Sequence, residues 1–425
     1  MVAGMKKLWG LLGVCMVSAL LGGCSAQEEE NGVCSVYYVN THSYYATAVA
    51  GFQNKNEEAQ IELIGFESDE ALVSQLATEM AAGEGPDVVL LSGDTQFDVY
   101  KAARSGQVLD LNKYIEKDEA YNEENYLISV MEAGKIRDEK QMVLPFSFTM
   151  DVLYMPKSSY EELGAADEDL VNYETMSQML VDYSKGLENE KFSQSYANTL
   201  NAESYLERSL SNADVINSAT LEVSRDAVDA VMEITNAIEE EVERKTELQS
   251  KEAKNPFELI MSITRNGNYF TGYAVANGMT QFYSEEECIT IPWRNMDGKI
   301  QPYVCDFGLV TSQSDSKQTS YDLLRYIMDY EVATEFNRPM SVSIRQLNRL
   351  LNYLELKKIS IIGENYKSIK LNEEQKAALW QDVQDMATAN FSSCGYMDVI
   401  TEKLNQNPDI SMEDLEDALQ RYLYE

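Results

Sequence analysis

Apolar residues near the start of the chain alternate between two spacings. Residues 33–39 form an apolar stretch rich in valine and tyrosine, which is typical of a buried strand. Further short strands are predicted at 61–64 and 87–91. Between the strands, apolar residues recur at the spacing of one helical face, first Tyr45, Ala48, Val49 and Phe52, then Leu72, Leu76 and Met80. This alternation predicts an α/β fold with a mostly parallel sheet flanked by helices.

Capping residues predict where the second helix begins and ends. Ser68 is suited to the N-cap, with Asp69 and Glu70 in the first turn. Gly83 is suited to the left-handed conformation that ends many helices.

The pattern changes after residue 140. Two extended pieces are predicted at 142–145 and 152–155, and residues 174–265 are mainly helical, with a long polar helix near 225–250. Extended segments return at 289–292 and 307–310. Two later helices have predicted buried faces, one with Leu324, Ile327 and Met328, the other with Leu415, Ala418, Leu419 and Tyr422. Ser411 and Asp414 make a capping-box pattern at the start of the last helix.

The first 23 residues have the features of an export signal. Lys6 and Lys7 precede an apolar run over 8–23, which is shorter than the roughly 20 residues of a membrane-spanning helix. Leu21-Gly22-Gly23-Cys24 resembles the lipobox of bacterial lipoproteins, which implies cleavage before Cys24 and acylation of its thiol. A plain secretory signal and an uncleaved signal anchor are the alternatives. Residues 24–32 are then a flexible tether, and the protein is extracytoplasmic, lipid-anchored to the cell membrane.

Composition and charge exclude several classes of function. The 425-residue chain has a formal net charge of −37, which repels nucleic acid, so we expect no nucleic-acid partner. A single histidine, His42, excludes a multi-histidine metal site, and we expect no metal and no cofactor. Cys34, Cys288, Cys305 and Cys394 are far apart and lack C-x-x-C spacing. Four cysteines permit three pairings, and buried thiols are equally compatible with the sequence.

Several segments, in order, resemble extracellular solute-binding proteins of bacterial ABC importers, of the carbohydrate type. They are Gly83–Val89 (a Gly-Pro-Asp step into a strand), Ser105–Leu111, Leu144–Tyr154, Pro292–Gly298, Phe307–Val310 and Ser411–Glu425. The sequence departs from the family pattern at Met155, where Asn is common, and at Glu174-Thr175, where Thr-Trp is common.

The resemblance implies a periplasmic-binding-protein-like fold of two α/β lobes joined by crossing hinge strands. It places lobe 1 at 33–147 and 304–346, and lobe 2 at 148–303 and 347–425. It also implies a monomeric receptor that holds a small solute, a sugar or oligosaccharide, in a cleft between the lobes. Closure around the ligand requires contacts with both lobes. The implied partners are this solute and the ABC permease.

Candidate ligand-binding residues follow the carboxyl ends of the predicted strands, where ligands of open α/β sheets bind. They are His42, Tyr44, Ser92, Asp94, Phe148, Thr149, Asp151, Tyr283, Trp293 and Arg294. Trp293 is the main candidate for stacking on a sugar ring. Four structural alternatives stand beside these assignments: Tyr45 is a core residue, Asp94 caps a helix, Phe148 packs in the hinge, and Arg294 pairs with an acidic residue.

Two other functions are compatible with the sequence. A secreted glycan-active hydrolase would need two catalytic carboxylates. With 71 acidic residues in the chain, the sequence does not single out any such pair. The sequence contains no G-x-S-x-G, H-E-x-x-H or phosphate-binding loop motif, so we expect a protein that is not an enzyme. A sensory or adhesive surface lipoprotein is the other alternative.

Overall fold

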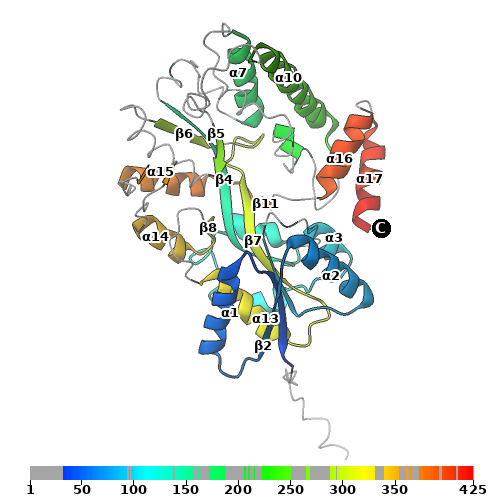
Figure 1. Cartoon of the computed structure of the whole chain (residues 1–425), viewed down its shortest axis with the longest axis vertical. Helices are drawn as coiled ribbons and strands as arrows, with labels where there is room; N and C mark the ends of the chain where they lie inside the picture. Colours follow the sequence, from blue (N-terminus) through cyan, green and yellow to red (C-terminus); the bar gives the residue numbers. More distant parts are fainter. Residues whose placement is uncertain are drawn as a thin grey trace, which may run out of the picture.

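The chain forms two lobes joined by long strands in the computed structural model (Figure 1). The structure describes residues 32–92, 95, 97–136, 139–156, 161, 172–186, 205–206, 209–210, 215, 223–249, 265–268, 288–292, 294–330, 339–353, 360–361, 364–365, 373–391, 395–407 and 410–424. The predicted signal and tether, with Cys24, lie outside these residues. No helix of the described segments combines the length and the apolar character needed to cross a bilayer.

The first lobe, at the bottom of Figure 1, is built from alternating strands and helices. These are β1 (Cys34–Val39), α1 (Ser43–Lys55), β2 (Ile61–Phe66), α2 (Asp69–Ala82), β3 (Val88–Ser92), α3 (Val99–Arg104), α4 (Asn112–Ile115), α5 (Ile128–Met131) and the 3-10 helix η1 (Glu132–Gly134). β1 pairs in parallel with β2 and with β3, as the alternation predicted. The predicted helical faces are buried, including Tyr45, Phe52, Leu72 and Leu76.

The ends of α2 confirm the capping prediction. The Ser68 hydroxyl accepts a hydrogen bond from the Ala71 amide, 3.3 Å away. Gly83 has φ of 75°, in the left-handed region that favours glycine, and ends the helix.

Two strands carry the chain between the lobes. β4 (Leu144–Pro156) is one continuous strand, so the expectation of two separate extended pieces is wrong. The pairing of β4 shifts register around Ser147, as at a β-bulge, so the strand continues through its irregular middle. β4 pairs antiparallel with β7 (Pro302–Val310) over its first half and with β5 (Arg265–Asn268) and β6 (Cys288–Pro292) over its second half.

These pairings make one mixed, nine-stranded sheet that runs through both lobes. Its order is β2-β1-β3-β7-β4-β5, with β6 and β8 (Met340–Ser341) beside β4 and β11 (Asn390–Phe391) beside β7. β9 (Ser360–Ile361) and β10 (Glu364–Asn365) form a separate pair. After β7 the chain forms α13 (Lys317–Met328) on the first lobe and then α14 (Ile344–Tyr353). The lobe boundaries inferred from the sequence stay a prediction.

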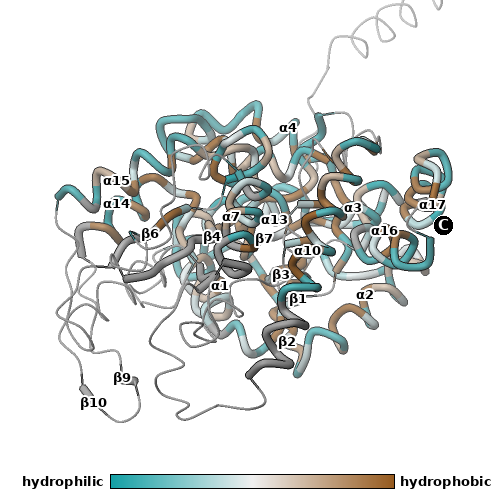
Figure 2. The backbone as a smooth tube through the Cα atoms, turned by 90° about the horizontal axis from the view of Figure 1, so that it is seen from above, coloured by the Kyte–Doolittle hydropathy of each residue, from teal (hydrophilic) through white to brown (hydrophobic). Residues whose placement is uncertain are grey.

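The second lobe is mainly helical in the described segments. It contains α7 (Tyr173–Gly186), α10 (Arg225–Gln249) and α15 (Glu373–Gln384), and α16 (Gly395–Gln406) and α17 (Met412–Tyr424) lie at one side of it in Figure 1. α10 confirms the predicted long polar helix. Figure 2 shows the amphipathic pattern of the outer helices, where α15 and α17 carry teal beside brown turns.

In the last helix, α17, the predicted capping contact is present, but the buried face differs from the predicted one. The Ser411 hydroxyl accepts from the Asp414 amide at 3.1 Å. Leu415 and Leu419 are buried as predicted, but Leu423 is the next buried residue, while Tyr422 is half-buried. The Tyr422 ring instead lies under the Lys101 ammonium of α3, 5.0 Å from its centroid.

Two of the four cysteines have described side chains, and both are thiols. Cys34 is buried in β1, with its sulfur 3.5 Å from the Ser320 hydroxyl. The Cys305 sulfur lies 3.7 Å from the Tyr303 carbonyl oxygen.

The carboxylate of Asp87 joins three segments at the base of the sheet. It accepts hydrogen bonds from the Ser35 amide (2.8 Å) and the Ser314 hydroxyl (2.6 Å), and further ones from the Ser35 hydroxyl and the amides of Asp315 and Ser316. Burial raises the pKa of Asp87, but these hydrogen bonds outweigh it and hold the pKa below its ordinary value. β1, β3 and the turn before α13 are therefore fixed to one ionised group.

Replacing this carboxylate should destabilise the fold. Asp87→Asn puts an amide NH₂ among donors, leaving at least one buried donor unsatisfied, so we expect a loss of about 3 kcal/mol in the free energy of unfolding. Urea unfolding measures it. Asp315→Asn in the same turn, where the side chain is exposed, is the matched control and should change stability by less than about 0.5 kcal/mol. Equal effects of the two substitutions would contradict the role given to Asp87.

Candidate functional site

The carboxyl ends of β1 and β3 meet the crossing strands at a junction between the lobes. β1 ends at Val39, and a short turn leads into α1, for which His42 is the N-cap residue. The His42 side chain makes no capping hydrogen bond, and its ring centroid lies 6.2 Å from that of Tyr45. The His42 imidazole is thus at the expected strand end and is half-buried.

The two tyrosines that open α1 have different environments. Tyr45 is fully buried, and its hydroxyl donates to the Leu91 carbonyl oxygen at 2.7 Å, which makes it the core residue that the sequence favoured. Tyr44 stacks obliquely on Tyr45, with ring centroids 4.2 Å apart. Its ring is partly exposed although its hydroxyl oxygen is buried. Burial, and then the charge of Asp306, raises the pKa of Tyr44 well above its ordinary value.

Asp306 is the central charged group of this junction. It is the only acidic residue of β7 and lies in register with Ser92 on one neighbouring strand and Ser147 on the other. The Ser147 hydroxyl donates to the Asp306 carboxylate at 2.6 Å. Asp306 is half-buried, so its carboxylate faces both the protein and solvent. Tyr44, Ser147 and Asp306 form what we call the junction site.

Ser92 is held in a hydrogen-bond chain at the end of β3. Its hydroxyl lies 3.3 Å from that of Thr95, and the Thr95 hydroxyl donates to the Asp69 carboxylate in the first turn of α2. Ser92 is 5% exposed. This chain fixes the end of β3 beside the junction site, and a ligand contact by Ser92 stays a prediction.

β4 contributes two candidates with opposite properties. Phe148 is 0% exposed and packs inside the crossing, which favours the hinge-packing alternative over a ligand contact. The next residue, Thr149, has a buried hydroxyl for which the described residues supply no hydrogen-bond partner. Such a group costs roughly 1–3 kcal/mol unless something pairs with it.

Arg294 pairs with an acidic residue, as its structural alternative expected. Its guanidinium donates to the Asp385 carboxylate and to the Gly298 carbonyl oxygen, the latter at 2.8 Å. Lys299 completes this cluster with a 2.7 Å ion pair to Asp385. The cluster closes the 294–300 turn and joins it to the end of α15.

The remaining candidates lie wholly or partly outside the described residues. Asp94, Tyr283 and Trp293 are outside them, and only the backbone of Asp151, in β4, is described. The described N-cap of α3 is Asp98, whose carboxylate accepts from the Lys101 amide at 2.8 Å. The N-cap position of α3 is therefore taken by Asp98, and the prediction for Asp94 lies outside the described residues.

Sequence reasoning missed Asp306 and Ser147, which carry the geometry of the junction. A signal for Asp306 exists, because a lone acidic residue interrupts an otherwise apolar strand at Val304-Cys305-Asp306-Phe307. Ser147 has no comparable signal, since its role depends on the bulge in β4. In the described part of the chain, no group of three or more His, Cys, Asp or Glu side chains is arranged to hold a metal ion.

Solved structures resemble this chain, whereas no protein-family model and no curated protein matches it. The sugar-binding protein MalE from Xanthomonas citri has 11% sequence identity and a TM-score of 0.57, covering 92% of this chain and 96% of its own. A family 1 extracellular solute-binding protein from Alicyclobacillus acidocaldarius has 12% identity and a TM-score of 0.55, covering 92% and 97%.

A third structure, an ABC substrate-binding protein from Listeria monocytogenes in complex with cycloalternan, has 14% identity and a TM-score of 0.51, covering 92% of this chain and 99% of its own. These neighbours are binding proteins, and at such identities the likeness concerns the fold. The chain therefore has the α/β fold of the extracellular solute-binding proteins, which confirms the fold that the sequence resemblance implied.

Proposed function

We propose that this protein is the substrate-binding lipoprotein of an ABC importer, which captures a sugar or oligosaccharide between its lobes and delivers it to the permease. The observation that carries the proposal is the junction site, where Tyr44 and Ser147 meet Asp306 at the carboxyl ends of β1 and β3. The fold shared with solved sugar-binding proteins supports it. The protein binds its ligand without transforming it.

The chemistry of the junction site suits a hydroxylated ligand. Asp306 is a charged acceptor for sugar hydroxyls, and hydrogen bonds to charged groups contribute about 1.5–3 kcal/mol each. Burial and the charge of Asp306 raise the pKa of Tyr44 further above neutral pH, so its hydroxyl stays a hydrogen-bond donor. The buried Thr149 hydroxyl gains a partner if a ligand hydroxyl reaches it.

Closure of the lobes completes the proposed site. A ligand can stabilise the closed state only by contacting both lobes more fully there than in the open state. Asp306 and Ser147 belong to the crossing strands, and Tyr44 belongs to the first lobe. Trp293 and Tyr283 remain the proposed contacts from the other side, with Trp293 stacking on a sugar ring.

A lipid anchor at Cys24 fits this role. Each acyl methylene buried in a bilayer contributes about 0.8 kcal/mol, so several chains hold a protein where one does not. Anchoring near the permease raises the effective concentration of the receptor there.

Sugar ligands should raise the melting temperature of the purified chain. A ligand present at about 100 times its dissociation constant stabilises the folded state by roughly 2.7 kcal/mol. Thermal shift over a panel of neutral mono- and oligosaccharides, with peptides and polyamines as comparison classes, measures this. Shifts confined to peptides or polyamines would refute the carbohydrate assignment and leave the binding role intact.

Asp306→Asn should weaken binding of the sugar found in that panel by at least tenfold, because the charged acceptor is lost. Titration calorimetry measures the affinity. Asp226→Asn on the exposed face of α10 removes an equal charge elsewhere and should leave the affinity unchanged. An unchanged affinity in Asp306→Asn would remove the junction site from the proposal.

Cys24→Ser should abolish lipid attachment and release the protein from the membrane. Metabolic labelling with a radioactive fatty acid and fractionation of the producing bacterium measure these two effects. Cys15→Ser, within the predicted signal, is the matched control and should remain labelled. Label retained in Cys24→Ser would contradict the lipobox.

A further inference from the structure

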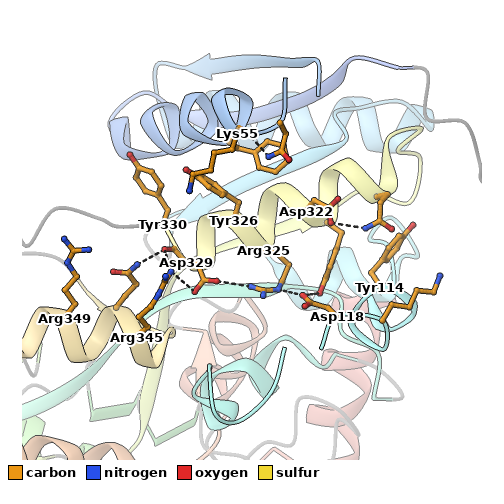
Figure 3. A pocket seen from close by; sticks show the side chains of 16 residues that line it. Lys55, Tyr114, Asp118, Asp322, Arg325, Tyr326, Asp329, Tyr330, Arg345 and Arg349 are labelled. Atoms are coloured by element: carbon orange, nitrogen blue, oxygen red, sulfur yellow. Dashed lines mark hydrogen bonds and ion pairs between the residues drawn. The ribbon is translucent and has the colours of Figure 1, made fainter. Parts of the chain in front are cut away.

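A groove of about 1100 Å³ lies along the outer face of α13, and we call it the α13 groove (Figure 3). The end of α1 borders it on one side, and the turn after α4 and the first turns of α14 border it on the other. None of the junction-site residues lines it. Its volume is slightly above the roughly 300–1,000 Å³ of small-molecule sites. The groove is therefore a surface separate from the junction site.

Two tyrosines form an aromatic platform in the groove. Tyr326 and Tyr330 are half-exposed, and their ring centroids lie 5.8 Å apart. They rest against α1 at Gly51, where a Cβ atom would lie 2.7 Å from the Tyr326 hydroxyl oxygen and 3.3 Å from the Tyr330 ring. Glycine inside a helix costs roughly 0.5–1 kcal/mol relative to alanine. At this position it leaves the space that the two rings occupy.

The floor of the groove is electrically balanced. Arg325 forms ion pairs with Asp118 (2.5 Å) and Asp329 (3.8 Å), and Arg345 forms a second ion pair with Asp329 (3.8 Å). The Tyr321 hydroxyl also donates to Asp118. Burial raises the pKa of Asp118, but Arg325 outweighs it and holds the pKa below its ordinary value. Figure 3 shows these charged groups as one row beneath the platform. The floor charges thus stabilise the protein and mostly cancel.

The rim of the groove is positively charged. Five of its sixteen lining residues are Lys or Arg, against 34 in 425 for a chain of net charge −37. Apart from Arg325 these are exposed: Lys55, Lys117, Arg345 and Arg349, of which Arg345 is already paired with Asp329 of the floor. Asp322 is the single acidic residue among the lining residues beyond the floor, and it accepts a hydrogen bond from the Gln318 side chain. An anionic group at the rim therefore meets an excess of cations.

We propose that the α13 groove binds an acidic oligosaccharide, with carboxylate or sulfate groups on its sugar rings. The half-exposed ring of Tyr330 suits the C–H face of a sugar ring, while the Lys55 ammonium lies over the Tyr326 ring, 4.9 Å from its centroid. Lys55 and the other rim cations suit the charged substituents. A short chain stays within about one Debye length, roughly 10 Å, of these cations, whereas a long polyanion such as nucleic acid also meets the negative surface beyond them. The proposal uses no residue of the junction site.

Titration calorimetry of the purified full chain with tetragalacturonate, at low salt, tests it. We expect binding of one molecule per chain, weakened by added salt because the rim cations are exposed. Maltotetraose, a neutral sugar of equal length, should not compete. Absence of tetragalacturonate binding, or binding that an acidic glutamate peptide matches in affinity, would overturn the proposal.

Two sets of variants locate the binding. Lys55→Gln combined with Arg349→Gln should weaken tetragalacturonate binding by at least tenfold, and Gly51→Ala, which displaces the platform, should also weaken it. Lys403→Gln on α16 removes a charge away from the groove and should have no effect. Melting temperatures establish that each variant folds. If Asp306→Asn abolished tetragalacturonate binding and the groove variants kept it, the ligand would bind at the junction site. That result would overturn the groove proposal and leave the proposed importer function standing.

Discussion

The hydrogen bonds to the Asp87 carboxylate fix the framework on which everything else in the first lobe is placed. Its donors come from residues 35 and 314–316, which lie far apart in the sequence but side by side at the base of β1 and β3. A buried carboxylate holds such donors only while they remain directed at it. The register of β3 against β7 follows from this arrangement, and that register puts Asp306 beside Ser92 and Ser147.

The junction site and the α13 groove share one structural connection. The Ser343 hydroxyl donates to Asp329 at the floor of the groove, 3.0 Å away. Two residues earlier, Ser341 in β8 pairs with Ser147 in β4, the residue that donates to Asp306. Asp329 and Asp306 are thereby held to neighbouring strands of one sheet. In a strongly acidic chain, hydroxyl or guanidinium partners stabilise the charge of each of these carboxylates.

Local patterns predicted most of the fold, and tertiary pairing decided what they missed. The buried faces of α1, α2 and α13 follow from helical spacing, and Ser68 and Gly83 mark the ends of α2 as expected. β4 was expected as two extended pieces on either side of residues 146–151, whereas a bulge and pairing with four strands keep it continuous. Ser147 and Asp306 are 159 residues apart, so no local signal links them. The groove likewise joins residues from α1 to α14 that only folding brings together.

The continuity of β4 through both lobes has a mechanical consequence. β4 and β7 remain hydrogen-bonded from Leu144 to Met150, and the same β4 then enters the sheet of the second lobe. Two paired strands resist sliding and stretching but yield to bending and twisting, and their register is irregular at Ser147. Bending of the two strands changes the angle between the lobes, and Asp306 pairs with Ser147 at the irregular point. A small bend in these strands therefore moves the far rim of a lobe by more than it moves the strands themselves.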